Sequence, residues 1–192
     1  MPAPRPPGKL RVIGGQWRSR VVEFDAADGV RPTPDRVRQT LFDWLSPLIS
    51  GARCLDLFAG SGALGIEALS RGAAHCSFVD EGSRQCQRIR AALQTLKASN
   101  AEVVQMESLY YIEQTWHRYN IVFLDPPFGG DLLARALPDL SKVLNPSNNR
   151  IYLEWGAGET PPLPPGFELL REKRAGQVCF GLATYHHPAD KR

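Results

Sequence analysis

The tetrapeptide Asp125-Pro126-Pro127-Phe128 follows a short apolar segment and combines groups that suit a reaction at an amine. Two consecutive prolines stop a strand and leave backbone carbonyls without partners in the chain. The Asp125 carboxylate and the Pro126 carbonyl can therefore accept both N–H bonds of the exocyclic amine of a base. Such contacts would direct the delocalised lone pair of that amine and stabilise positive charge developing on nitrogen. Phe128 can stack on the base. These four residues are the expected catalytic motif, although an isolated motif of this kind can also be a plain strand-ending turn.

A second motif is the glycine loop, in which Gly60, Gly62 and Gly65 have the spacing G-x-G-x-x-G. A strand is expected before the loop and a helix after it. Asp80 lies 20 residues beyond Gly60, at the end of the next expected strand. Glycines let the backbone approach a ligand closely, and a downstream acid binds ribose hydroxyls. The loop and Asp80 together predict a nucleotide-binding site.

Asp56, at the end of the strand before the loop, discriminates between two nucleotide ligands. A dinucleotide brings a pyrophosphate to the helix N-terminus, and a carboxylate at this position would repel it. S-adenosylmethionine (SAM) instead carries an ammonium group that the carboxylate would attract. Asp56 therefore favours SAM as the cofactor. The alternative role of Asp56 is to stabilise the loop.

Strands and helices alternate from residue 52 onward, which predicts a doubly wound α/β sheet of the Rossmann-like type. Short apolar runs indicate strands, and apolar residues at helical spacing indicate helices. The expected strands cover residues 53–58, 74–79, 101–105, 121–124 and 151–155, with a closing antiparallel pair over 167–173 and 177–185. The expected helices in this part of the chain cover residues 63–70, 83–97, 108–116 and 130–142.

The segment before this sheet has its own pattern. Apolar residues alternate around Gly14-Gly15, which predicts a β-hairpin near residues 10–24. Thr33, as an N-cap before Pro34, predicts a helix over residues 34–46. We therefore expect three parts: a disordered Pro-rich tail over residues 1–9, a hairpin-and-helix extension over 10–50, and a catalytic domain over 51–187.

The basic excess of the chain lies in its first fifth. Residues 1–38 carry a formal charge of +4 and the remainder −1, which gives the net +3. Such a patch attracts polyanions by releasing counterions, and the arginine fork pairs with phosphate in a bidentate way. The patch predicts an RNA-binding extension; a basic tail that only aids solubility is the alternative. The expected RNA contacts are Arg11, Arg18, Arg20, Arg31, Arg36 and Arg38.

Composition excludes several other classes. No apolar stretch approaches the length of about 20 residues needed to span a bilayer, and the start has no apolar signal region. The four cysteines lack the paired spacing of zinc sites, so we expect no metal. Reduced structural thiols imply the cytosol. The expected protein is thus cytoplasmic and without a membrane anchor.

The combination of the two motifs resembles the SAM-dependent amino methyltransferases. Several stretches resemble more specifically the bacterial family of small-subunit (16S) ribosomal RNA guanine-966 N2-methyltransferases, and the resemblance spans residues 10–185. These stretches are residues 11–18, 31–42, 55–73, 125–128 and 171–178. The resemblance implies methyl transfer from SAM to the N2 amine of guanine-966 in 16S ribosomal RNA, within a small-subunit particle or assembly intermediate, by a monomeric enzyme whose methyltransferase domain is residues 51–187.

The resemblance also assigns the cofactor contacts. Glu107 departs from the Asp or Asn that the family commonly has near the adenine amine, and its longer side chain could still accept that hydrogen bond. The assigned SAM-binding residues are Asp56, Phe58, Ala59, Gly60, Ser61, Gly62, Asp80 and Glu107.

Three other functions compete with this interpretation. An NAD-dependent oxidoreductase would need a proton relay, which His75, His117, His186 and His187 do not form in any recognisable pattern, and it would leave residues 125–128 unused. A non-catalytic RNA-binding assembly factor would not need an intact tetrapeptide. The same chemistry on adenine N6 or on a glutamine amide more often uses Asn first and Tyr last, so Asp125 and Phe128 favour guanine N2.

Overall fold

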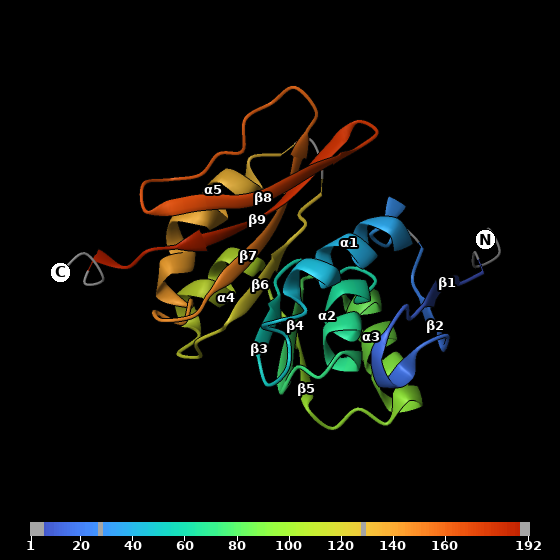
Figure 1. Cartoon of the computed structure of the whole chain (residues 1–192). Coiled ribbons are helices and arrows are strands. Elements are labelled where there is room, and N and C mark those ends of the chain that lie inside the picture. Colours follow the sequence, from blue (N-terminus) through green and yellow to red (C-terminus); the bar gives the residue numbers. More distant parts are fainter. Residues whose placement is uncertain (1–5, 27–28, 128–129, 189–192) are drawn as a thin grey trace.

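A seven-stranded sheet forms the centre of the computed structural model, which describes residues 6–26, 29–127 and 130–188 (Figure 1). The strand order is β5-β4-β3-β6-β7-β9-β8. The first five strands in that order are parallel, and β9 is antiparallel to both β7 and β8. The strands are β3 (Arg53–Asp56), β4 (His75–Asp80), β5 (Ala101–Gln105), β6 (Ile121–Leu124), β7 (Arg150–Gly156), β8 (Phe167–Ala175) and β9 (Val178–Tyr185). The predicted doubly wound α/β fold is thereby confirmed.

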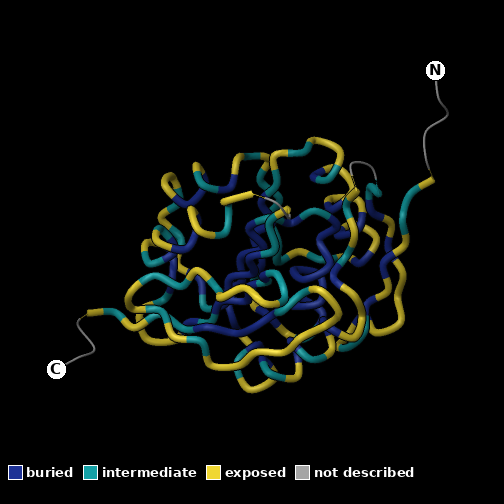
Figure 2. The backbone as a smooth tube through the Cα atoms, turned by 90° about the horizontal axis from the view of Figure 1, so that it is seen from above, coloured by how far each residue is buried: buried dark blue, intermediate teal, exposed yellow. Residues whose placement is uncertain are grey.

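Helices cover both faces of this sheet. Successive residues of a strand point to opposite faces, so the buried side chains fall into two apolar clusters, one on each side. Figure 2 shows the buried backbone concentrated at the centre of the molecule, with exposed segments around it. One face packs against α1 (Asp35–Leu45), α2 (Ala63–Ser70) and α3 (Ser83–Leu96); the other packs against α4 (Ser108–Gln114), α5 (Leu132–Asp139) and the 3-10 helix η3 (Leu140–Lys142).

The N-terminal extension begins with the predicted hairpin, built from β1 (Gly8–Arg11) and β2 (Val21–Phe24). The turn between them is longer than expected and contains the 3-10 helix η1 (Gly15–Trp17). Gly8 and Lys9 pair with Phe24 and Glu23, so the predicted disorder of residues 1–9 is wrong at these two positions. Leu10, Val22 and Phe24 are buried in the same cluster as α2 and α3, and the extension therefore shares the core of the sheet domain.

A buried carboxylate fixes this extension to α2. Glu67 is fully buried and accepts hydrogen bonds from the backbone N–H groups of Ile13 and Gly14 at 3.0 and 2.9 Å. It also accepts from the guanidinium groups of Arg38 and Arg71, at 3.3 and 2.8 Å. A buried charge is stable only when it is paired and hydrogen-bonded, and these four donors satisfy Glu67.

Arg38 was expected to contact RNA, and the structure corrects that expectation. Its side chain is 1% exposed. The guanidinium donates to the carbonyls of Thr33 and Arg11 and pairs with Asp35 and Glu67. These four acceptors bind the guanidinium inside the protein. Arg38 therefore holds α1 and the hairpin on α2 and does not present its charge to solvent.

The four cysteines are free thiols, and Cys54, Cys76 and Cys86 are buried. Over the described residues, no helix combines the length and apolar character that a bilayer crossing requires.

Candidate active site

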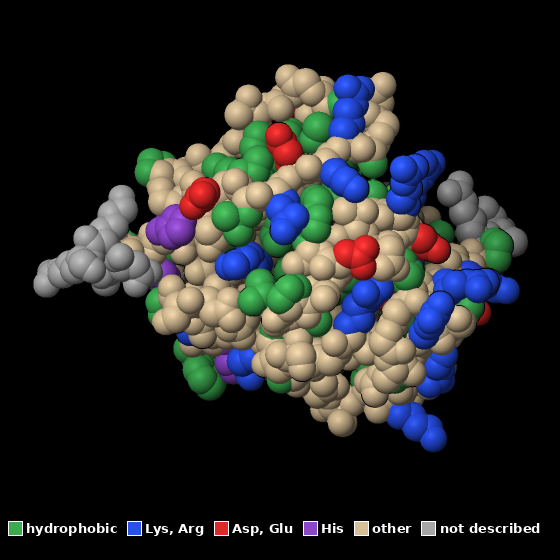
Figure 3. Space-filling model, in the orientation of Figure 1, with side chains coloured by type: hydrophobic (Ala, Val, Ile, Leu, Met, Phe, Trp, Pro, Cys, Tyr) green, Lys and Arg blue, Asp and Glu red, His purple; other side chains and the backbone are tan. Residues whose placement is uncertain are grey.

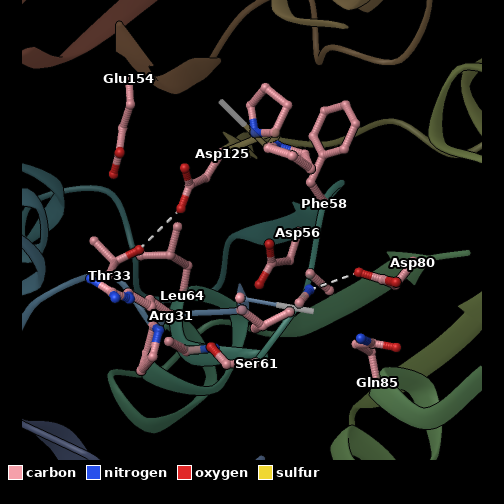
Figure 4. Close-up of a pocket in the computed structure, with 18 of the residues that line it drawn as sticks. Arg31, Thr33, Asp56, Phe58, Ser61, Leu64, Asp80, Gln85, Asp125 and Glu154 are labelled. Atoms are coloured by element: carbon pink, nitrogen blue, oxygen red, sulfur yellow. Dashed lines mark hydrogen bonds between the residues drawn. The ribbon is translucent and has the colours of Figure 1, made fainter. Parts of the chain in front are cut away.

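The candidate site lies at the carboxyl ends of β3 and β6, where the strand order reverses direction. Open α/β sheets bind ligands at this switch point. A cavity of about 960 Å³ opens here, and its walls include Asp56, Asp80, Asp125 and Glu154 from four neighbouring strands or strand ends. The segment over residues 29–34, just before α1, closes another side. Figure 4 shows these acidic side chains around one space.

The glycine loop has the geometry that its sequence predicts. Gly60 and Gly62 have φ values of +52° and +77°, which L side chains rarely adopt. Gly65 is needed for a different reason, because a Cβ there would lie 2.3 Å from the ring of Phe78 on β4. The third glycine thus lets α2 approach the sheet closely, and the first two turn the loop, of which Gly60 lies on the cavity wall.

Asp56 and Asp80 both shape this loop. Asp56 accepts from the N–H of Gly65 at 3.0 Å and is 2% exposed. Asp80 accepts from the N–H groups of Gly60 and Gly82, each at 2.8 Å. Burial raises the pKa of Asp56 to about 7; the Gly65 hydrogen bond opposes this shift and the charge of Asp80 adds to it. The loop-stabilising role of Asp56 is therefore present in the structure, and its position on the cavity wall leaves the SAM contact as a prediction.

The other residues assigned to SAM also line the cavity, except Gly62. Phe58, Ala59, Gly60 and Ser61 lie along it. Glu107 lies on the wall too, and its carboxylate caps α4 by accepting from the N–H groups of Leu109 and Tyr110 at 3.1 and 2.7 Å. A carboxylate has about four acceptor sites, so Glu107 retains capacity for a ligand.

Asp125 follows β6 and faces the cavity together with Pro126 and Pro127. The fourth member of the motif, Phe128, lies outside the described residues. The hydroxyl of Thr33 donates to Asp125 Oδ2 at 3.3 Å (Figure 4). This contact corrects the predicted N-cap: Pro34 caps α1 without a side-chain hydrogen bond, and the Thr33 side chain binds Asp125 instead.

Glu154 on β7 is a site residue that the sequence analysis missed. The register pairs Phe123 with Tyr152, so the residues two positions further on, Asp125 and Glu154, emerge side by side on the same face. Figure 4 shows the two carboxyl groups facing one another. Burial raises the pKa of Asp125 to about 8, with the charge of Glu154 as the next cause. The sequence did contain a signal for this residue, because Glu154 is the charged member of an otherwise apolar expected strand.

The predicted RNA contacts other than Arg38 are on the surface. Arg11, Arg18, Arg20 and Arg36 are exposed, and exposed Arg31 also reaches the cavity wall. Arg20 donates to the carbonyl of Thr95 on α3. Figure 3 shows Lys and Arg side chains over α1 and the N-terminal hairpin. The five arginines remain a prediction, now with accessible charges.

A further basic segment was not anticipated. Arg171, Lys173 and Arg174 are exposed on β8, and the adjoining hairpin reaches the cavity through Ala175 and Val178. Lys and Arg side chains also lie over this hairpin in Figure 3. A surface able to bind a polyanion therefore borders the cavity from β8 as well as from α1. Within the described ranges, no group of three or more His, Cys, Asp or Glu side chains could hold a metal.

Comparisons with known proteins extend over nearly the whole chain. Residues 10–184 match the model of a family described as conserved hypothetical protein 95. The chain is 44% identical over 178 residues to Ribosomal RNA small subunit methyltransferase D of Escherichia coli K12, covering 91% of this chain and 89% of that protein. It is 40% identical over 185 residues to the protein of that name from Haemophilus influenzae, covering 93% and 95%. The solved structure of a putative methyltransferase from Escherichia coli aligns with a TM-score of 0.84 at 42% identity, covering 94% and 99%.

Proposed function

Because the chain belongs to the family of ribosomal RNA small subunit methyltransferase D, we propose that it methylates the exocyclic N2 amine of guanine-966 in 16S ribosomal RNA. Family membership makes it a methyltransferase whose cofactor is SAM. The observation that carries the finer assignment is that Asp125 and Pro126 share one cavity with the glycine loop and Asp80. A base amine bound at Asp125 would lie in the same space as the cofactor.

The side chains of the cavity fit SAM. Asp80 has acceptor sites beyond the two used by Gly60 and Gly82, and these suit ribose hydroxyls. Asp56 suits the ammonium group, whose positive charge would offset the burial that raises the pKa of this carboxyl. Glu107 suits the adenine amine. When bound, SAM supplies an electrophilic methyl group on its sulfonium.

The catalytic motif would prepare the amine for transfer. The Asp125 carboxylate and the Pro126 carbonyl accept its two N–H bonds and so direct its lone pair into the cavity. Both acceptors also stabilise the positive charge that grows on nitrogen. Asp125 must be ionised to do this, and the Thr33 hydroxyl favours its ionised form. The proton released from the product can pass to water, so no further residue is needed as a base.

The RNA would be held from outside the cavity. Arg11, Arg18, Arg20, Arg31 and Arg36 are the proposed phosphate contacts, since each presents a guanidinium at the surface. Phosphate contacts position a nucleic acid without reading its sequence. We propose the small-subunit particle or its assembly intermediate as the partner, a monomer as the active form, and the cytoplasm as the location.

The test is to locate the methyl group. The protein is incubated with isotopically labelled SAM and small-subunit particles that lack the modification, and the labelled nucleoside is then identified and mapped. We expect N2-methylguanosine at position 966. Label in N6-methyladenosine or on a glutamine amide would overturn the proposed acceptor. Thermal melting with SAM and with NAD separates the oxidoreductase alternative, because only a true ligand raises the melting temperature.

A further inference from the structure

The carboxyl group of Glu154 lies on the wall of the cavity, where it could bind a ligand. It lies on β7 among the buried residues Tyr152, Leu153 and Trp155, and its carboxyl group opens on the cavity beside Asp125. The hydroxyl of Tyr152 donates to Glu154 Oε1 at 2.5 Å and thereby fixes the orientation of the group. None of the ion pairs among the described residues includes Glu154.

This arrangement disfavours the charged form of Glu154. Burial raises the pKa of Glu154, and the hydrogen bond that Tyr152 donates opposes that shift without cancelling it. Glu154 is only partly exposed, and a carboxylate held away from water without a cation is favourable only if hydrogen-bond donors satisfy it. The cavity side of Glu154 is where an incoming donor could do so. A second acceptor fixed next to Asp125 therefore fits a ligand with two neighbouring groups of N–H donors.

Guanine has this pattern on one edge. Its N2 amine and its N1–H lie next to one another, and both donate. Resting on the proposed function, we infer that Glu154 accepts the N1–H of the target guanine while Asp125 and Pro126 hold the N2 amine. Glu154 then acts as the residue that selects the base, and Asp125 remains the residue that acts on the reacting nitrogen.

The same contact explains how adenine would be rejected. The atom next to the exocyclic amine of adenine is the unprotonated N1, which is a hydrogen-bond acceptor. A carboxylate facing that lone pair would be repelled, and both groups would lose their solvent partners without gaining new ones. Sites built to bind a donor reject an analogue that lacks it by large factors, because a buried acceptor is left unpaired.

A base analogue isolates the contact. 2-Aminopurine keeps the exocyclic N2 amine but has an unprotonated N1, so it offers Asp125 the same donor and offers Glu154 an acceptor. Target RNA would be prepared with guanine or 2-aminopurine at the modified position, and kcat/KM measured for the wild-type protein, Glu154→Gln and a control, Glu168→Gln. Glu168 is an exposed glutamate on β8 that pairs with His186, so the control repeats the change outside the cavity.

We expect the wild-type protein and Glu168→Gln to prefer guanine by about 100-fold or more. Glu154→Gln can donate to N1 of 2-aminopurine, so its activity on guanine should fall while that on 2-aminopurine is kept or rises. 2-Aminopurine also lacks the guanine oxygen, but a preference that depends on that oxygen would persist in Glu154→Gln. SAM affinity, measured by calorimetry, should be the same in all three proteins.

Two results would overturn the inference. One is an equal loss on both bases in Glu154→Gln, which would make Glu154 a support for Asp125 without a role in base choice. The other is equal wild-type activity on both bases, a result that needs no variant and stands even if Glu154→Gln fails to fold. Failure of the proposed function would look different, because the wild-type protein would then leave guanine itself unmethylated.

Discussion

At the scale of single residues, the cavity keeps the carboxyl groups of Asp56, Asp125 and Glu154 in surroundings that favour their neutral forms. The pKa of Asp125 is raised to about 8 and that of Asp56 to about 7, in both cases chiefly by burial. Asp56, Asp80 and Asp125 could be predicted from sequence because each ends an apolar run, and parallel strands bring their carboxyl ends to one edge. Glu154 could not, because its place beside Asp125 depends on the register between β6 and β7, which no local pattern encodes.

Asp125→Asn should separate catalysis from cofactor binding. The amide keeps the shape of the side chain but replaces a charged acceptor, and loss of one preorganised acceptor lowers kcat by about 100-fold or more. SAM affinity should change little, because the proposed cofactor contacts lie on other strands. Single-turnover kinetics and calorimetry measure the two effects, with Asp139→Asn, a partly exposed carboxylate of α5 outside the cavity, as control. Wild-type turnover in Asp125→Asn would remove Asp125 from the reaction.

Relative to the wild-type protein, the same variant should become more stable as the pH rises. The pKa of Asp125 is about 8 in the folded protein and about 4 in an unfolded chain, so the folded state binds the proton more tightly. Ionising Asp125 therefore costs folding free energy progressively between about pH 4 and pH 8. Asparagine does not ionise. Asp125→Asn should melt near the wild-type temperature at pH 5 and above it at pH 8.5; a difference independent of pH would contradict the assigned pKa.

At the scale of elements, α2 organises both ends of the site. Its N-terminus carries the glycine loop, and Glu67 on the same helix binds the turn of the hairpin and Arg38 of α1. The hairpin, α1 and α2 were each predicted from local patterns. Their attachment to one another was not, because it rests on hydrogen bonds between residues more than 50 positions apart. The interior position of Arg38 follows from that attachment, so composition alone could not reveal it.

Glu67→Ala should destabilise the whole fold. Removing this carboxylate leaves the buried Arg38 without one of its charge partners and two backbone N–H groups without acceptors. Breaking a buried pair in this way costs about 3–5 kcal/mol. Urea denaturation measures the change, and Glu113→Ala, at an exposed position of α4, should stay within about 0.5 kcal/mol of the wild-type value. Equal stability of the two variants would show that Glu67 does not hold the extension.

At the scale of the whole molecule, charge and cavity are arranged around one opening. Exposed arginines of the extension lie on the α1 side, and the basic stretch of β8 leads to the hairpin that reaches the cavity from the other side. The uneven charge of the sequence predicted the first of these surfaces. The second was not predicted because Glu168 and Glu172 lie close to Arg171, Lys173 and Arg174 in a part of the chain that is nearly neutral overall. Only the fold shows that the hairpin carrying them reaches the cavity.

Replacing Arg11, Arg18 and Arg20 by alanine should weaken RNA binding through salt-dependent contacts. Each lost phosphate contact lowers the slope of log affinity against log salt by about one, and weakens all RNA sequences alike. The triple variant should therefore flatten the slope by up to about three, with SAM affinity unchanged. Arg118→Ala, an exposed arginine just before β6 at the opposite edge of the sheet, serves as control. A triple variant with the wild-type slope would show that these arginines do not grip RNA.

The hydrogen bond from Thr33 to Asp125 joins residues 92 positions apart and crosses from the extension to the end of β6. Its consequence concerns how this enzyme can be recombined. A chimera that takes the first part of its chain from another methyltransferase would also replace residues 29–34 of the cavity wall and the hydrogen-bond donor to Asp125. The extension and the residues around Asp125 should therefore be exchanged together, because a segment exchanged alone would lose its partner across this hydrogen bond.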